Sequence, residues 1–320
     1  MKLKDMYERI VREGMAADPR GLKQAEDDLK NNKTLYEQMS KDKKEFFDKE
    51  ALKNPYSDTR ILNGADEKEI KTTMVGIDIE TPELLLIDKL NSSLGAKEKI
   101  DLAFSHHPQG AAYAHFYEVM SMQADIFHHI GVPINICEGL VQERKQQVAR
   151  RIHAANHFRS IDAARLLNIA FLCAHTPADN HVVSYLTKTM EEKAPKTLSD
   201  IIKILNSIEE YQIAKKQFSG PQILMGSPQN RCGKIFVDMT GGTEGPKEMI
   251  SNLAQAGVGT IIGMHMSEEH YHKIKDKHIN VIIAGHIASD TLGMNLLLDK
   301  LEKGSKMKIL TCSGFKRIKR

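Results

Sequence analysis

The chain has 320 residues, 41% of them hydrophobic and 27% charged, and its 45 basic and 42 acidic side chains leave a formal net charge of +3. A chain of this size buries a substantial core, and its length suggests about two globular units. The near balance of charge argues against a polyanion partner across the whole surface, and the four cysteines, with no Cys-x-x-Cys spacing, argue against a zinc ribbon or a disulfide framework.

The first 70 residues are rich in Lys, Glu, Asp and Gln and carry few large apolar groups. In "LKQAEDDLKNNKTLYEQMSKDKKEFFDKEALK" apolar residues recur at roughly helical spacing, which predicts a helical extension. We expect its surface to be mostly solvated; a partner-binding or lid element is the alternative. The initial "MKLKDMYERIVREG" lacks the apolar core of a signal peptide, and no stretch approaches the roughly 20 apolar residues of a membrane span, so we expect a cytoplasmic protein.

Strand and helix signals alternate from about residue 72 onward. "TTMVGIDIE" and "IDLAFS" are typical of strands, and the helix between them begins at "TPELLLIDKL", where Thr81 can cap it and Pro82 suits its first turn. A long helical stretch from Ala111 to about Leu167 is interrupted near "GVP" at residues 131–133. Further strands are expected at "IAFLCAH", "PQILMG", "KIFVDMT", "GTIIGMHM", "INVIIAGH" and "KMKILTC". This alternation predicts an α/β fold with mixed or mainly parallel sheets.

Four of the expected strands finish on a histidine or one residue before it. The four are His106, His175, His265 and His286. Because ligands of open α/β sheets bind outside the carboxyl ends of the strands, this shared placement indicates a site, although any one of the four alone would more often be structural. Asp179 follows His175 by four residues, and Asp290 follows His286 by four residues.

These residue types favour a metal site. Imidazole nitrogens and carboxylate oxygens are the ligands of zinc, manganese or iron, whereas a calcium site needs more oxygen ligands. The adjacent His106 and His107 precede Pro108, where the backbone leaves the sheet and both rings could turn into one pocket. Two ions would explain the doublet, because a single ion does not require both residues. A surface doublet at a strand end is the alternative.

We expect two interlinked α/β lobes with the metal site between them, preceded by the helical extension. The predicted boundaries are residues 1–70 for the extension, 71–215 for the first lobe, which holds the histidine pair and Asp179, and 216–320 for the second lobe, which holds the late His-x-x-x-Asp.

The segments "SHHP", "AHTPAD" and "GHIASDTLG" together resemble the dinuclear-metal-centre family of GTP cyclohydrolase I type 2 homologues, also called NGG-one-interacting-factor-three-like proteins. The resemblance spans residues 72 to about 305. It implies two divalent ions per chain, Zn, Mn or Fe, with His175 close by as a candidate proton shuttle. The ligands that it implies are His106, His107, Asp179, His286 and Asp290. Among them Asp179 is the best candidate for a bridge between the ions.

The chain departs from the family pattern at two places. Asp290 stands where the family has glutamate, and Met264 and His265 stand where it has an acidic residue after a glycine. The shorter side chain at position 290 is expected to alter the metal distance or the metal preference. "TGGTEGP", residues 240–246, could offer backbone amides to a phosphate, but a plain turn between a strand and a helix is the better interpretation.

We expect a metal-dependent hydrolase that acts on a nucleotide-like or other small-molecule substrate through a metal-activated water. The alternative is a non-catalytic metal-binding or regulatory and interaction module. A histidine-rich metallophosphoesterase or a deaminase is disfavoured, and the PCxxC motif of the zinc deaminases is missing. The resemblance implies a homo-oligomer, in the form of a ring-shaped hexamer. Nucleic acid is not expected as a partner, because only the tail "FKRIKR" is locally basic and we expect it to be a solvated terminus.

Overall fold

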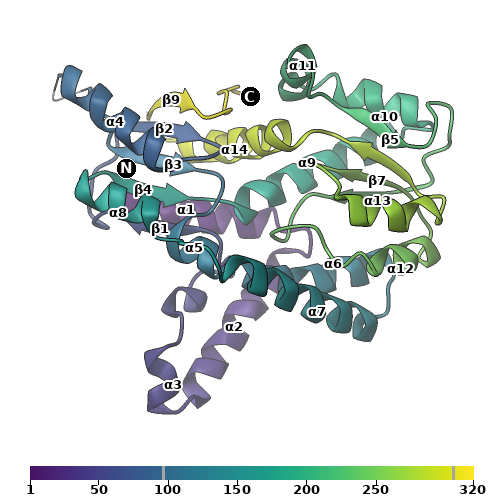
Figure 1. Cartoon of the computed structure of the whole chain (residues 1–320), viewed down its shortest axis with the longest axis horizontal. Coiled ribbons are helices and arrows are strands. Elements are labelled where there is room, and N and C mark those ends of the chain that lie inside the picture. Colours follow the sequence, from purple (N-terminus) through teal and green to yellow (C-terminus); the bar gives the residue numbers. More distant parts are fainter. Residues whose placement is uncertain (96–97, 305–306) are drawn as a thin grey trace.

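The computed structural model describes residues 1–95, 98–304 and 307–320, and its strands form two sheets (Figure 1). The five-stranded sheet has the order β1-β4-β3-β2-β9, and the four-stranded sheet has the order β5-β8-β7-β6. The strands are β1 (Arg60–Asn63), β2 (Thr72–Gly76), β3 (Leu102–Ser105), β4 (Ala170–Cys173), β5 (Gln222–Met225), β6 (Lys234–Asp238), β7 (Val258–Gly263), β8 (Asn280–Ile283) and β9 (Lys308–Cys312). Each sheet has one antiparallel edge strand, β1 or β5, and is otherwise parallel. The predicted α/β fold with mixed, mainly parallel sheets is confirmed.

The central strands of the larger sheet are covered on both faces, which explains their nearly continuous apolar runs. All residues of β2, β3 and β4 are buried. Because β3 and β4 are parallel neighbours, their last residues, Ser105 and Cys173, lie side by side in the register. The segments that follow these two strands therefore leave the sheet at the same place.

Helices cover both sheets. They are α1 (Leu3–Ala16), α2 (Leu22–Gln38), α3 (Lys41–Glu45), η1 (Lys49–Leu52), α4 (Thr81–Ser93), α5 (Gly110–Ala114), η2 (Phe116–Ser121), α6 (Met122–Ile130), α7 (Ile134–Ile152), α8 (Arg159–Leu166), α9 (Thr176–Lys193), α10 (Leu198–Leu205), α11 (Glu209–Lys216), α12 (Met249–Gln255), α13 (Glu268–Lys275) and α14 (His286–Glu302). Helices α9 and α14 pack together in the middle of the molecule (Figure 1). A Cβ added at Gly293 would lie 2.5 Å from the carbonyl oxygen of Ala178, so the two helices cross closely.

This crossing connects the two sheets. Helix α9 directly follows β4 of the five-stranded sheet, and α14 directly follows β8 of the four-stranded sheet. Strands β1 and β9, although far apart along the chain, both belong to the five-stranded sheet. The three-part division of the chain at residues 70 and 215 stays a prediction.

Two local predictions can be compared with the helix ends. The expected break near residues 131–133 is confirmed, since α6 ends at Ile130 and Gly131 adopts a left-handed conformation with φ of 112°. The predicted cap of α4 is wrong by one residue. Glu80 takes the N-cap position, and its backbone N–H donates to the Glu83 carboxylate at 2.9 Å, so Thr81 is already helical.

The N-terminal helices differ from one another in burial. Helix α1 buries one apolar face, including Leu3, Met6 and Ile10, in the core of the larger sheet, whereas Ala25 alone is buried in α2. Helices α2 and α3 project from the body (Figure 1). The expectation of a mostly solvated extension therefore fits α2 and α3 but is wrong for α1. Arg20, only 3% exposed, anchors the base of α2 through ion pairs with Asp18, Asp28 and Asp125.

The basic C-terminal tail is docked on the body. Arg317 pairs with Asp299 and Glu302, and Arg320 pairs with Glu210, which is fully buried. The expectation of a solvated tail is therefore wrong, because neighbouring carboxylates neutralise its charge. Within the ranges that the structure describes, every helix is too short or too polar to cross a membrane.

Candidate metal centre

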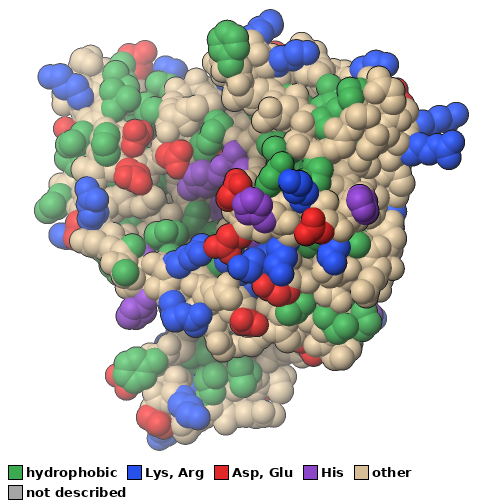
Figure 2. Space-filling view, turned by 45° about the vertical axis from the view of Figure 1, so that its right-hand side comes forward, with side chains coloured by type: hydrophobic (Ala, Val, Ile, Leu, Met, Phe, Trp, Pro, Cys, Tyr) green, Lys and Arg blue, Asp and Glu red, His purple; other side chains and the backbone are tan. Residues whose placement is uncertain are grey.

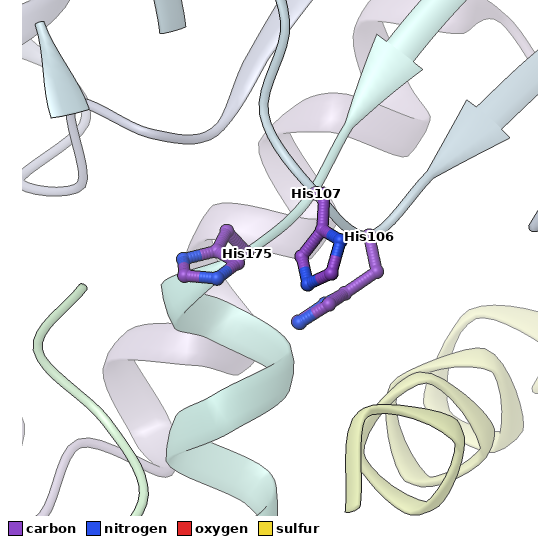
Figure 3. Close-up of side chains that lie close together, drawn as sticks. All are labelled: His106, His107 and His175. Atoms are coloured by element: carbon purple, nitrogen blue, oxygen red, sulfur yellow. The ribbon is translucent and has the colours of Figure 1, made fainter. Parts of the chain in front are cut away.

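Three strand ends deliver the histidines of the candidate site. His106 and His107 follow β3, and His175 follows β4 and precedes α9. Their side chains point toward one another (Figure 3), with ring centroids 5.1 Å apart for His106 and His107 and 4.7 Å apart for His106 and His175. His286 opens α14 after β8, and its ring centroid lies 5.3 Å from that of His107. The structure thus brings these four histidines to one place in the fold.

The backbone after β3 explains how two adjacent imidazoles reach one pocket. The N–H groups of His106 and His107 both donate to the carbonyl oxygen of Ile77, at 3.2 and 2.9 Å, so the chain turns as it leaves the sheet. The rings consequently make an interplanar angle of 46° instead of pointing to opposite faces. At the start of α14, Gly285 has a backbone φ of 108°, which a glycine adopts readily. This turn directs His286 toward the same pocket.

Asp290 lies at the centre of the histidines. Its Oδ1 is 3.5 Å from His106 Nε2, and its Oδ2 is 3.5 Å from both His107 Nε2 and His286 Nε2. Asp179, from the first turn of α9, places its Oδ1 3.5 Å from His106 Nε2. All five residues that the resemblance implied as ligands are thus gathered in one cluster, with His175 beside them.

Within this cluster three sets of residues have ligand atoms within 4.8 Å of one another and could hold a metal ion. The sets are His106, His107 and His175; His107, His286 and Asp290; and His106, Asp179 and Asp290. Asp290 is common to the second and third sets.

Outer hydrogen bonds orient three of the imidazoles. His107 Nδ1 is 2.6 Å from Asp78 Oδ1, His175 Nδ1 is 2.9 Å from Asp58 Oδ2, and His106 Nδ1 lies 3.1 Å from the carbonyl oxygen of Ala174. For His106 and His107 the second ring nitrogen faces Asp290, the arrangement in which an outer acceptor fixes the orientation of a metal-binding histidine. Such an acceptor also selects the tautomer of the ring.

Sequence reasoning missed Asp58 and Asp78. Asp78 follows β2 within "GIDIE", so its place after a strand was a signal that could have found it. Asp58 lies in a loop before the antiparallel strand β1, which pairs Arg60 with Cys173, and no local pattern marks it. Its carboxylate is fully buried and also accepts a hydrogen bond from the Thr176 hydroxyl at 2.6 Å.

The inner carboxylates and His106 have buried atoms that lack partners. Among the residues that the structure describes, His106 Nε2, Asp179 Oδ1 and both carboxylate oxygens of Asp290 make no hydrogen bond although they are shielded from solvent. Leaving such groups unpaired costs free energy. A divalent cation among these atoms would satisfy all of them, so the residues fit a metal ion.

The electrostatics of the cluster agree with that fit. Burial raises the pKa of Asp179 well above its ordinary value, and the neighbouring Asp290 adds to the effect. Burial also lowers the pKa of His106 far below its ordinary value, which leaves this imidazole neutral. Burial opposes the charge of His107 too, but the facing carboxylates of Asp290 and Asp78 outweigh burial and raise its pKa to about 9. The cluster thus combines buried carboxyl groups with imidazoles, and a cation bound among them would be favoured.

A pocket of about 90 Å³ opens beside the cluster. Its lining includes His286 and Asp290, Asp238 at the end of β6 and Glu244 in the turn that follows. Burial raises the pKa of Asp238 to about 6. Burial opposes ionisation of Glu244, but bonds from His265 and the Ser267 backbone prevail and lower its pKa to about 2. Figure 2 shows histidine side chains gathered in a hollow of this face and bordered by acidic ones.

Fold and site together define an α/β protein with a buried histidine and aspartate cluster that could hold metal. The family model Duf34/NIF3 (NGG1p interacting factor 3) matches residues 146–314, and the chain belongs to this family. The resemblance predicted from the sequence is thereby confirmed. The matched range includes His175, Asp179, His286 and Asp290, whereas His106 and His107 precede it.

Three solved structures to which the chain is similar differ in how closely they match it. A NIF3 superfamily protein from Sphaerobacter thermophilus is 27% identical, with a TM-score of 0.69, and the match covers 81% of this chain and 91% of that one. Reduced HcgD from Methanocaldococcus jannaschii is 12% identical over 79% of this chain and 87% of its own, with a TM-score of 0.48. TTHA1606 from Thermus thermophilus is 14% identical over 79% of this chain and 86% of its own, with a TM-score of 0.44. No curated protein matches the chain.

Proposed function

We propose that the chain holds two divalent ions, one among His107, His286 and Asp290 and the other among His106, Asp179 and Asp290. The observation that supports this most directly is the position of Asp290, whose Oδ1 faces His106 while its Oδ2 faces His107 and His286. We therefore propose Asp290 as the bridging carboxylate, in place of Asp179, which sequence alone favoured. Nitrogen and oxygen ligands of this kind suit Zn, Mn or Fe.

We further propose that the centre serves a hydrolase that acts on a small molecule. When bound, two metal ions at such a site provide Lewis acidity and lower the pKa of a water molecule to about 7. Each ligand set contains three residues, which leaves room for water and substrate, as in catalytic sites.

His175 is the proposed proton carrier. Asp58 Oδ2 lies 2.9 Å from its Nδ1, Asp179 Oδ2 lies 3.7 Å from the same nitrogen, and the ring centroid lies 4.7 Å from that of His106. A general acid or base must be held within hydrogen-bond reach of the group it serves, and a buried carboxylate behind an imidazole gives it a fixed orientation.

One observation favours the alternative of a non-catalytic metal-binding module. The pocket beside the cluster measures about 90 Å³, whereas sites for small organic ligands commonly measure about 300–1,000 Å³. A nucleotide-like substrate would therefore reach the cluster with only one end. The homo-oligomer, its ring-shaped hexameric form and the cytoplasmic location expected from the sequence stay predictions, and sedimentation analysis of the full chain tests the first two.

Turnover with defined substrates tests the hydrolase proposal. The full chain is loaded with Zn, Mn or Fe and assayed against a nucleotide panel that begins with GTP. We expect saturable turnover that is lost in His107→Ala and retained in His272→Ala, a control on the exposed face of α13, 69% exposed. Full metal loading without turnover on any substrate class would contradict the hydrolase and favour the metal-binding module.

A further inference from the structure

The histidines of the centre form a row that continues to the molecular surface through His265. This residue follows β7, outside the two ligand sets proposed above. Its ring packs against His286 with centroids 4.9 Å apart, and His286 in turn lies 5.3 Å from His107. Exposure of the side chains falls along the row, from 49% at His265 to 41% at His286, 23% at His107 and zero at His106.

We propose that His265 is a capture residue, which binds a divalent cation from solvent and passes it to His286 and then to the buried ligands. The proposal rests on the metal centre proposed above. His265 would take part in loading and release and would hold no ion in the loaded protein.

Distances along the row suit such a transfer. At a Zn–N distance of about 2.0–2.1 Å, two nitrogens that share one ion lie within about 4.2 Å of each other. Imidazoles whose centroids are 4.9 and 5.3 Å apart can bring ring nitrogens to that separation. An ion could therefore exchange one water or one nitrogen at a time, without passing through a state in which it lacks ligands.

Glu244 fixes the orientation of His265. Its Oε1 lies 3.7 Å from His265 Nδ1 and accepts the Ser267 backbone N–H at 2.6 Å. The backbone oxygen of Glu244 is itself held by Arg144 Nε at 3.1 Å. With Nδ1 turned to the carboxylate, Nε2 is the nitrogen that can bind an ion.

The surroundings of His265 favour a hydrated cation. Asp238 and Glu244 line the same pocket, and carboxylates in a cleft raise the local concentration of cations and their rate of association. The pocket volume of about 90 Å³ is enough for several water molecules, each of which needs about 10–15 Å³ of such space, and so suits an ion with part of its hydration shell.

Loading kinetics of the metal-free full chain test the proposal. Co²⁺ is added in a stopped-flow instrument and its binding followed by visible absorption, and release is followed with excess chelator. For His265→Ala we expect uptake and release both slower by about tenfold, the low end of on-rate effects of charged clefts, with unchanged affinity and ions per chain. His265→Cys, which restores a metal-binding side chain, should recover part of the rate, and Glu244→Gln should fall between wild type and His265→Ala.

The control is His272→Ala, which removes an exposed imidazole of the same region and should load at the wild-type rate. Equal rates for His265→Ala and wild type would overturn the capture role and leave the metal centre intact. Fewer ions per chain in His265→Ala would overturn it as well, since His265 would then be a permanent ligand. A wild-type chain that binds no Co²⁺, Zn²⁺ or Mn²⁺ would overturn both the centre and the capture residue.

Discussion

Metal binding should release a proton from His107, and Asp78 should control how many are released. In the metal-free protein the facing carboxylates of Asp290 and Asp78 outweigh burial and raise the pKa of His107 to about 9. This imidazole is therefore almost fully protonated at pH 7, and an ion can bind it only after the proton leaves. Below its pKa, the protonated ring competes with the ion tenfold more strongly for each unit that the pH falls.

The magnitude follows from that pKa. Between pH 7 and 9 the apparent affinity for the ion bound by His107 should rise about 100-fold, or about 2.7 kcal/mol, and should level off above pH 9. Asp78→Asn removes a carboxylate 2.6 Å from Nδ1, so the pKa of His107 should fall and the rise should end at a lower pH. Above pH 9 the same variant should bind about 10–100-fold more weakly than wild type, the usual loss when an outer partner of a metal-binding histidine is removed.

Calorimetry in buffers of different ionisation enthalpy measures the protons released per ion. Wild type at pH 7.5 should release close to one proton from this ligand, and Asp78→Asn should release fewer. His272→Ala is the control, because it removes an exposed imidazole outside the cluster and should release as many protons as wild type. Binding with no proton release and no change of affinity between pH 7 and 9 would refute the reasoning.

Three further variants test the packing. Gly293→Ala should destabilise the protein by about 1–3 kcal/mol, because its Cβ would lie 2.5 Å from a carbonyl oxygen of α9. Gly139→Ala should stabilise the protein by about 0.5–1 kcal/mol, because this position of α7 has open space around it. Urea denaturation measures both changes. In wild type the free energy of unfolding should fall by about 3 kcal/mol on acidification because of His181, and His181→Leu should abolish this loss. Burial lowers the pKa of His181 to about 4, so the unfolded chain binds a proton that the native state resists, and stability falls as the pH drops from about 6.5 to 4; equal pH profiles would contradict this. Arg20→Met should cost about 3–5 kcal/mol in chemical denaturation by stranding the buried Asp18, and a change within error would contradict it.

The ligand positions could be predicted from the sequence because they follow from local rules. A buried strand followed by a histidine puts that side chain at the carboxyl edge of a sheet, and a carboxylate four residues into the next helix lies on the same helical face. His286 and Asp290 satisfy both conditions, and the structure places them 3.5 Å apart. The close packing of α9 against α14, which connects the two sheets, could not be predicted, because nothing in either strand pattern specifies it.

The outer partners could not be predicted, because they depend on long-range pairing. Asp58 reaches His175 only through the antiparallel register between β1 and β4, more than a hundred residues apart. Spacing alone cannot say whether Asp179, which we expected as the bridge after the resemblance, or Asp290 lies between the imidazoles.

Helix α1 did carry a signal. Leu3, Met6 and Ile10 repeat at helical spacing, but the polar composition of the surrounding 70 residues obscured it.

Elemental analysis of the full chain, purified without chelators and then loaded, tests the central claim most directly when it is made on wild type and Asp290→Asn together. Because Asp290 contributes to both ligand sets, we predict two divalent ions per wild-type chain and a loss of both in the variant. A wild-type chain that retains no ion, or an Asp290→Asn chain that retains two, would contradict the account.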